Sequence, residues 1–197
     1  MARALTLVAL RQCSTEPLSE PGLSHQIAMP EVRAPEDCLS RAQLAEKYKD
    51  SMPAEMLKRA ARPFAIDMRP VEPENFMQAE KRAPNRMVWI RLNETLPKDY
   101  PWHIHMLAYA SDMTLLETSL RPHGVSMFTP NLQIASLDHS MWFHRPMRMD
   151  EWLLYVQDSP SSSAARGFSR GSIFSRTGEL LVSVAQEGLI RMREPKP

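Results

Sequence analysis

The sequence predicts an α+β domain in which an antiparallel sheet wraps one central helix. Three observations carry this prediction: a long apolar segment of helical character at 103–120, two short strand-like runs before it, and four strand candidates after it. Strands that pack on a single buried helix satisfy the requirement that each element covers its apolar face. A chain of 197 residues is long enough to bury such a core.

The part of the chain before the domain has a different composition. Ten of the 17 prolines precede residue 98, and four of them fall within 14–37, which predicts an extended connector there. Residues 40–62 contain strong helix formers, a capping serine at Ser40 and an interruption at Pro53, and these features predict two short helices. We therefore divide the chain into an irregular N-terminal segment and linker over 1–62 and a domain over 63–193.

The first half of the domain contains the first strands and the helix. The runs 64–68 and 87–92 are rich in aliphatic and aromatic residues and are bounded by proline and charge, which predicts paired strands. Residues 103–120 contain no glycine or proline and are apolar on nearly every side, which predicts a buried helix. The sequence Arg-Pro-His-Gly at 121–124 is a helix stop.

The second half of the domain predicts four strands, at 133–143, 152–157, 168–175 and 180–192. The last two are joined by Arg176–Glu179, a hairpin loop in which Gly178 can adopt a left-handed conformation. Two strands, one buried helix and four more strands constitute the hotdog arrangement.

Composition and charge exclude several classes of function. A net charge of +1 provides no global field to attract nucleic acid or an anionic membrane. No apolar run approaches the roughly 20 residues that span a bilayer. Cys13 and Cys38 belong to no CxxC or histidine-rich spacing, so the sequence predicts neither a zinc site nor a disulfide framework, and a reducing compartment is the default.

Polar residues at positions that the pattern buries are the candidate functional residues, because burial without a partner is costly. Asp112 lies in the middle of the apolar helix, although a surface position beside Ser111 fits the periodicity equally well. In the last strand, alternation places Gln186 on one face with four aliphatic residues, and a lapse of the pattern at a sheet edge is the alternative. Ser136 shares a face with Ile134 in the strand after the helix.

Nucleophilic catalysis is a weaker interpretation of the same strand. Alternation over 134–142 assigns Ser136, Asp138 and Ser140 to one face and His139 to the other, so Asp138 and His139 are not expected to form a dyad. A set of Ser136, Ser140 and His139 lacks the GxSxG turn that normally presents such a serine.

Metal and phosphate sites are also weakly indicated. His103 and His105 are two residues apart, whereas metal-binding helices use histidines four apart. Arg166, Arg170 and Arg176 could contact a phosphorylated ligand or could form the solvated face of a strand.

Several motifs in order resemble the type II acyl-CoA thioesterases, a family that includes bacterial thioesterase II and the peroxisomal acyl-CoA thioesterases. The main motifs are SLDHSMWFHR at 136–145, DEWLLY at 150–155 and VAQEGLIR at 184–191. Shorter matches are VWIR at 88–91, YASD at 109–112, PHG at 122–124 and SSAARGFSRG at 162–171. The resemblance runs from about Pro21 to Arg191.

This resemblance implies a fold, a reaction and a site. The family has two hotdog domains in one chain and hydrolyses fatty acyl-CoA to free fatty acid and CoA without a metal or organic cofactor. Its catalytic residues are an aspartate in the hotdog helix, a serine or threonine in the following strand and a glutamine in the last strand. By motif these are Asp112, Ser136 and Gln186.

The chain also departs from the family, because it begins near the end of where the first hotdog would lie. This departure keeps a second hypothesis open, in which the chain is a truncated, non-catalytic remnant that binds acyl-CoA or oligomerises. A lone hotdog predicts a homo-oligomer. For location we expect the cytoplasm, with the peroxisomal matrix as the alternative, although the ending Glu194-Pro195-Lys196-Pro197 is not an SKL-type signal.

Overall fold

The structure is a computed structural model that describes residues 7–11, 22–60, 62–75, 77–97 and 100–194. The helical elements are η1 (Pro35–Asp37), α1 (Arg41–Lys47), η2 (Lys49–Ser51), α2 (Ala54–Ala60), α3 (Tyr100–Leu115) and η3 (Leu116–His123). The strands are β1 (Leu7–Arg11), β2 (Ile66–Pro70), β3 (Asn85–Leu92), β4 (Leu132–Ser136), β5 (Asp138–Phe143), β6 (Leu153–Ser163), β7 (Arg166–Ser175) and β8 (Leu180–Met192). Cys13 and the last three residues of the chain lie outside the described residues.

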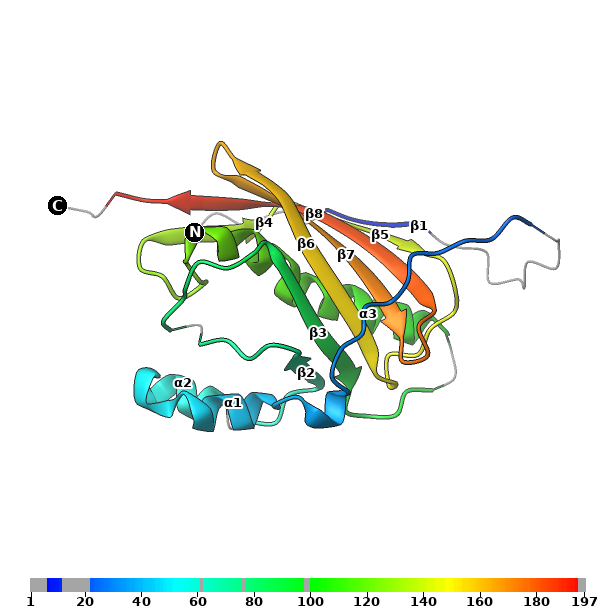
Figure 1. The fold of residues 1–197 in the computed structure, drawn as a ribbon, viewed down its shortest axis with the longest axis horizontal. Helices are drawn as coiled ribbons and strands as arrows, with labels where there is room; N and C mark the ends of the chain where they lie inside the picture. The colour runs from blue at the N-terminus through cyan, green and yellow to red at the C-terminus, as the bar shows by residue number, and fades with distance from the viewer. Residues whose placement is uncertain (1–6, 12–21, 61, 76, 98–99, 195–197) are drawn as a thin grey trace.

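One curled sheet contains all of these strands and wraps α3 (Figure 1). In the described part of the chain the strand order is β1-β5-β8-β7-β6-β3-β2, and β4 also pairs with β8. Every pairing from β2 to β8 is antiparallel, and only β1 runs parallel to its neighbour β5. The predicted α+β hotdog arrangement is confirmed.

The N-terminal segment contains more regular structure than expected. Its two short helices are α1 and α2, and α1 begins with a capping box in which Ser40 and Gln43 bond each other's backbone amides. Residues 7–11 form β1, which joins the sheet beside β5. Without β1, β5 would be an edge strand with unpaired backbone N–H and C=O groups. The backbone of β1 pairs with these groups.

The central helix differs from its prediction in length and in exposure. It begins at Tyr100 rather than at residue 103, and from Leu116 it continues as the 3₁₀ helix η3 to His123, followed by Gly124 at φ 67°. It is not buried on every side, because Trp102 and Tyr109 are 55% and 57% exposed. The apolar residues of one helix face therefore point to solvent.

Five of the six predicted strands have different bounds, and two of them, β3 and β7, begin two residues earlier than expected, at Asn85 and Arg166. The first strand runs over 66–70 instead of 64–68, and the strand predicted at 152–157 extends to Ser163. The strand predicted at 133–143 divides at Leu137 into β4 and β5. Ser136 faces Gly188 in β8 and Ser140 faces Ala185, so four steps along one strand oppose three along the other. This mismatch is a β-bulge.

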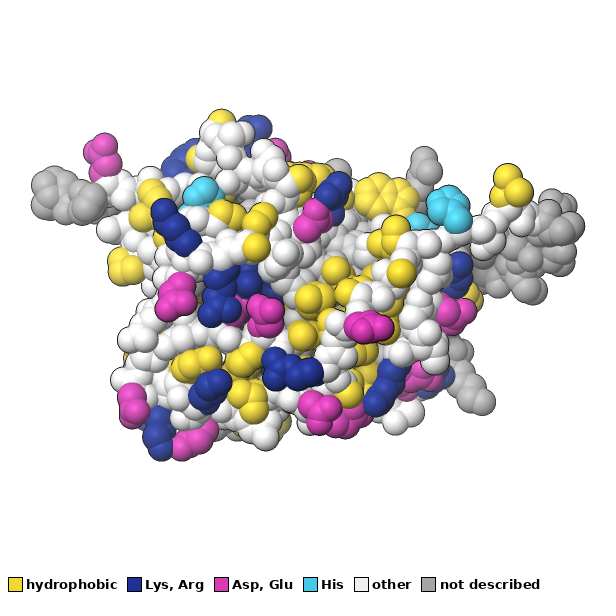
Figure 2. All heavy atoms as spheres, in the orientation of Figure 1, with side chains coloured by type: hydrophobic (Ala, Val, Ile, Leu, Met, Phe, Trp, Pro, Cys, Tyr) yellow, Lys and Arg dark blue, Asp and Glu magenta, His cyan; other side chains and the backbone are white. Residues whose placement is uncertain are grey.

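Two hydrophobic clusters lie on opposite faces of the sheet. The larger one fills the space between the sheet and α3 and includes Ile90, Leu107, Leu115, Tyr155 and Val182. The smaller one includes Trp89, Trp152 and Phe174 on the outer face, where Met29, Val32 and Cys38 of the N-terminal segment cover them. Hydrophobic side chains gather over β3, β6 and β7 on this outer face (Figure 2).

A hydrogen bond fastens the N-terminal segment to the outer face. The indole Nε1 of Trp89 donates to the carbonyl oxygen of Arg33 at 2.8 Å, which satisfies the polar atom of a buried tryptophan. The helix-facing side of the sheet is therefore the side that remains for the candidate site. No helix in the described part of the chain is long and apolar enough to cross a membrane.

Candidate active site

Asp112 lies in the last turn of α3, at the boundary between the buried and exposed faces of the helix. Its neighbour Ser111 is fully buried against the sheet, whereas the Asp112 side chain is 42% exposed. The two alternatives from the sequence are thus both partly correct. A carboxylate in this position can contact the sheet with one oxygen and solvent with the other.

Ser136 and Gln186 both bind the same oxygen of Asp112. Ser136 ends β4, and its Oγ donates to Asp112 Oδ1 at 2.8 Å. Gln186 in β8 donates to this Oδ1 through its Nε2 and is fully buried. The two side chains share a face because Ser136 pairs with Gly188, which lies two residues from Gln186. The structure therefore brings together the three residues that the sequence analysis selected.

The second carboxylate oxygen of Asp112 has a different environment. The structure shows no hydrogen bond from any described residue to Oδ2. Two donors hold Oδ1 against β4 and β8, and the 42% exposure of the side chain leaves Oδ2 accessible to water. This arrangement can hold a water molecule and accept a proton from it.

His139 is the residue that sequence reasoning misplaced. Simple alternation put it on the face opposite Ser136, but the bulge at Leu137 adds one residue and rotates His139 onto the side that faces the helix. Its Nδ1 lies 3.9 Å from Asp112 Oδ1, and its Nε2 lies 2.8 Å from the Oγ of Ser111. Burial lowers the pKa of the His139 imidazole, although the carboxylates of Asp112 and Asp138 act in the opposite direction.

The structure does not bring Ser136, Ser140 and His139 together as a nucleophilic triad. Asp138 is exposed and accepts a hydrogen bond from the backbone amide of Glu187, so it does not pair with His139. Ser136 donates to Asp112, and the serine that contacts His139 is Ser111. The expected separation of Asp138 and His139 onto opposite faces is confirmed, whereas the expected shared face of Ser136 and Asp138 is wrong because of the bulge.

Two further buried polar atoms lie beside the cluster. Ser169 in β7 pairs directly with Gln186, and both side chains are fully buried. The Ser169 Oγ and the Gln186 Oε1 have no hydrogen-bond partner among the described residues. Sequence reasoning missed Ser169, although its position between Gly167 and Gly171 on alternate residues was a signal for an inward-facing site.

The arginines considered for phosphate binding are engaged in ion pairs. Arg170 pairs with Asp158, and Arg176 pairs with Glu36 across 2.8 Å. Arg166 lies 3.8 Å from Glu187. Their interpretation as the solvated face of a strand is therefore the one that the geometry supports. The described residues contain no group of three or more His, Cys, Asp or Glu side chains that could hold a metal ion.

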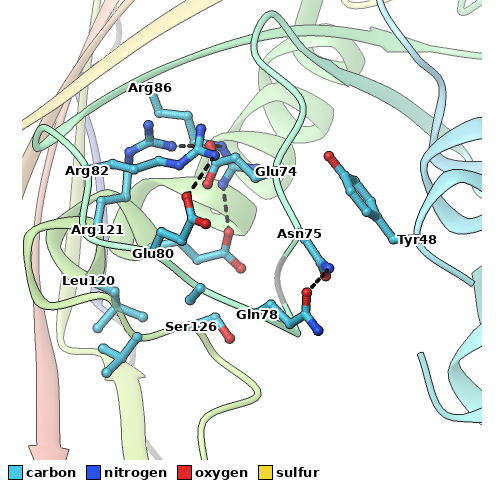
Figure 3. A pocket seen from close by; sticks show the side chains of 13 residues that line it. Tyr48, Glu74, Asn75, Gln78, Glu80, Arg82, Arg86, Leu120, Arg121 and Ser126 are labelled. Atoms are coloured by element: carbon cyan, nitrogen blue, oxygen red, sulfur yellow. Dashed lines mark hydrogen bonds and ion pairs between the residues drawn. The ribbon is translucent and has the colours of Figure 1, made fainter. Parts of the chain in front are cut away.

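A separate cavity of about 260 Å³ lies between residues 74–86, η3 and the end of α1 (Figure 3). Glu74, Arg86, Glu117 and Arg121 line it, with Arg86 Nη1 2.6 Å from Glu117 and Arg121 bound to Glu74. None of the residues of the Asp112 cluster lines this cavity. Its charged groups balance each other and stabilise the packing of η3 against the chain before β3.

The fold and the cluster define the class of the protein: a hotdog-fold domain with a polar site centred on one carboxylate of the central helix. A family model described as "Acyl-CoA thioesterase" matches residues 54–189. The chain belongs to the acyl-CoA thioesterase family.

Individual relatives agree with this membership. The chain is similar to acyl-coenzyme A thioesterase 8 of Mus musculus (36% identity, covering 92% of this chain and 58% of the relative). It is also similar to acyl-CoA thioesterase 2 of Haemophilus influenzae (33% identity, 89% and 61%). Among solved structures it resembles the acyl-CoA thioesterase II TesB2 of Mycobacterium marinum, with 37% identity, a TM-score of 0.67 and coverage of 89% and 60%. The chain thus spans about 60% of the length of these relatives.

Proposed function

We propose that the chain hydrolyses fatty acyl-CoA to a free fatty acid and CoA, using a water molecule that Asp112 activates and that Ser136 and Gln186 help to position. The observation that carries the proposal is the double hydrogen bond of Ser136 and Gln186 to one oxygen of Asp112. Family membership supports fatty acyl-CoA as the substrate class. The geometry of the site supports attack by a water molecule that Asp112 activates.

The proposed reaction balances without any group from outside the chain except water. The water oxygen forms a bond to the thioester carbonyl carbon, and Asp112 Oδ2 accepts the proton that water gives up. The carbon–sulfur bond then breaks, and the CoA thiolate leaves and receives the proton. A thioester suits this mechanism because its leaving group is stable as an anion, so a positioned general base is enough.

The test is release of free thiol from octanoyl-CoA and palmitoyl-CoA by the purified 197-residue chain. Asp112→Asn removes the base and keeps the shape, so kcat should fall by about 10²- to 10⁴-fold. Asp138→Asn is the matched control, because this exposed carboxylate is close in sequence but outside the cluster, and it should retain activity. Equal activity of Asp112→Asn and the wild type would refute the proposed base.

A second candidate function is binding of acyl-CoA without turnover. It is favoured by the open site, in which the Asp112 side chain is 42% exposed. In that case palmitoyl-CoA should raise the thermal midpoint of unfolding, as any ligand of the native state does, while no thiol is released. Thermal unfolding with and without ligand therefore accompanies the activity assay.

The oligomeric state belongs to the same proposal. The exposed side chains of Trp102 and Tyr109 lie on the helix that carries Asp112, and a second copy of this chain would cover them and close the site. Light scattering of the purified chain should then give the mass of a dimer, and Tyr109→Lys should give a monomer with lower activity. A fully active monomer would contradict this arrangement.

The domain division and the location are proposals as well. The division after residue 62 is supported by the sheet from β2 to β8, all of which lies within 63–193. For location we retain the cytoplasm and, as the alternative, the peroxisomal matrix, since a relative from Saccharomyces cerevisiae is named a peroxisomal thioester hydrolase. Fluorescence microscopy of the tagged chain in its own cell type distinguishes the two.

A further inference from the structure

His139 is a titratable side chain beside Asp112 that the proposed reaction does not use. Its ring is 1% exposed, and it lies between Ser111 on the helix and the oxygen of Asp112 that accepts Ser136 and Gln186. The Nδ1 atom is buried and has no hydrogen-bond partner among the described residues. A buried polar atom without a partner requires a physical explanation.

The hydroxyl of Ser111 contacts one ring nitrogen of His139. This hydroxyl has one proton and three acceptors within reach: His139 Nε2 at 2.8 Å, the Ala108 carbonyl oxygen at 3.2 Å and the Met141 sulfur at 3.6 Å. Ser111 can meet either tautomer across the contact to Nε2: it donates to an unprotonated Nε2, or it accepts from Nε2–H and donates to the Ala108 carbonyl oxygen. An imidazole that accepts at Nε2 carries its own proton at Nδ1 when it is neutral.

The charge of Asp112 favours the tautomer of His139 that carries the proton on Nδ1. With Nδ1 protonated, an N–H dipole faces a carboxylate oxygen 3.9 Å away, and the interaction is attractive. With Nε2 protonated, a lone pair would face that oxygen and repel it. At 3.9 Å the contact is too long for a hydrogen bond, so the effect acts through the field of the dipole.

The imidazole acts as a dipole rather than as a cation because it is neutral near pH 7. Burial lowers its pKa, and the charges of Asp112 on α3 and of Asp138, the preceding residue on the opposite face of its own strand, do not outweigh burial. Tyr155 on β6 is also neutral, since burial and the Asp112 carboxylate raise its pKa well above the usual value. From β8, the uncharged amide of Gln186 binds the same Asp112 oxygen that His139 faces.

We propose that His139 is a positioning residue for Asp112: the charge of Asp112 holds the neutral imidazole as the Nδ1–H tautomer, whose dipole keeps Oδ1 toward the sheet and leaves Oδ2 for water. The proposal rests on the proposed function for its effect on catalysis. Its structural part, the tautomer, does not depend on turnover. The two parts can therefore be tested separately.

Two amide substitutions separate the two ring nitrogens. The amide nitrogen of His139→Asn takes the place of Nδ1, and that of His139→Gln takes the place of Nε2. If the group facing Asp112 is what matters, His139→Asn should keep kcat within about threefold, and His139→Gln should lower kcat about tenfold with KM nearly unchanged. Ser111→Ala removes the hydroxyl that contacts Nε2 but keeps the imidazole ring. Its kcat should lie between those of His139→Asn and His139→Gln.

Thermal unfolding of each variant controls for a merely structural role. If both amide variants lose activity in proportion to their loss of stability, or if both match the wild type, the positioning role is overturned while the proposed hydrolysis stands. If the wild-type chain shows no turnover, the proposed function is wrong. The tautomer is then tested by spectroscopy alone.

The tautomer is measured by nitrogen NMR on the wild-type chain with labelled histidine, near pH 7. The signal of His139, identified by its absence in His139→Gln, should show a protonated Nδ1 and an unprotonated Nε2. Asp112→Asn should increase the share of the other tautomer, because it removes the charge that favours Nδ1–H. A wild-type signal with Nε2 protonated would overturn the proposal whatever the activity.

Discussion

At the scale of single residues, the site depends on one carboxylate oxygen that accepts two donors. Ser136 and Gln186 come from β4 and β8, which pair with each other, so both donors are fixed by the same ladder. Hydrogen bonds to a charged group contribute about 1.5–3 kcal/mol each. In the proposed mechanism these two hydrogen bonds orient the carboxylate, which a single flexible donor would do less well.

Loss of one donor should therefore reduce activity without abolishing it. Ser136→Ala leaves Gln186 in place, and we expect kcat to fall about 10- to 100-fold, the equivalent of one hydrogen bond to a charged group. Ser136→Thr keeps the hydroxyl on a side chain suited to strands and should remain within about threefold of the wild type. Steady-state thiol release measures both, and an Ala variant as active as the Thr variant would contradict this role.

The sequence singled out Asp112, Ser136 and Gln186 but not the contacts of His139. The first three were recognisable as polar residues at buried positions and from the motifs that contain them. The place of His139 depends on whether alternation continues through Leu137, and nothing local distinguishes a regular strand from a bulged one there. Pairing with β8 decides it.

At the scale of elements, the packing of η3 against the sheet requires glycine in β8. A Cβ built on Gly188 would lie 2.3 Å from Leu116 Cδ1, far inside van der Waals contact. Gly188 is also the partner of Ser136 in the ladder, so the packing of η3 and the position of the site serine depend on the same residue.

Gly188→Ala should consequently lower the free energy of unfolding by about 1–3 kcal/mol, the usual cost of overpacking a core. The cost arises from Leu116, so Gly188→Ala should cost much less in a Leu116→Ala background. Denaturant unfolding of the four proteins in this cycle measures the coupling. An equal cost in both backgrounds would show that the close approach is not its cause.

The turn between β6 and β7 is strained. Ala164 and Ala165 form its two central positions and have φ values of 48° and 59°, a region that side chains other than glycine and asparagine avoid. This turn closes the extension of β6 that the sequence pattern did not predict, because a run of serines and alanines has no strand periodicity.

Ala165→Gly should relieve this strain and increase stability by about 0.5–1 kcal/mol, since the gain exceeds the added entropy of the unfolded chain. Ala42→Gly in α1, where the helix disfavours glycine, is the control and should be destabilising. Thermal unfolding of both variants tests the difference, and loss of stability in both would mean that the turn is not strained.

At the scale of the whole molecule, stability should depend on pH through His139, which is buried, and His144, which is on the surface. Burial lowers the pKa of His139, and burial together with Arg145 lowers that of His144. In the unfolded chain a histidine titrates near pH 6.5. The unfolded state therefore binds more protons than the native state between the lowered pKa and about pH 6.5.

The free energy of unfolding should thus decrease as the pH falls below about 6.5 and level off below the native pKa. His139→Gln should weaken this dependence, whereas His25→Gln, on the exposed N-terminal segment, is the matched control. Denaturant unfolding at a series of pH values measures the slopes. Equal slopes for His139→Gln and the wild type would show that His139 does not contribute.

The sequence alone determined the fold class, the order of the elements and the three polar residues of the site. These features follow from periodicity, turn residues and motifs, which are local properties of the chain. The tertiary structure decided the exposed face of α3, the addition of β1 beside β5 and the bulge that turns His139 toward Asp112. Each of these depends on pairing or packing between segments far apart in the chain, because burial of a side chain is decided by its partner and not by its neighbours in sequence.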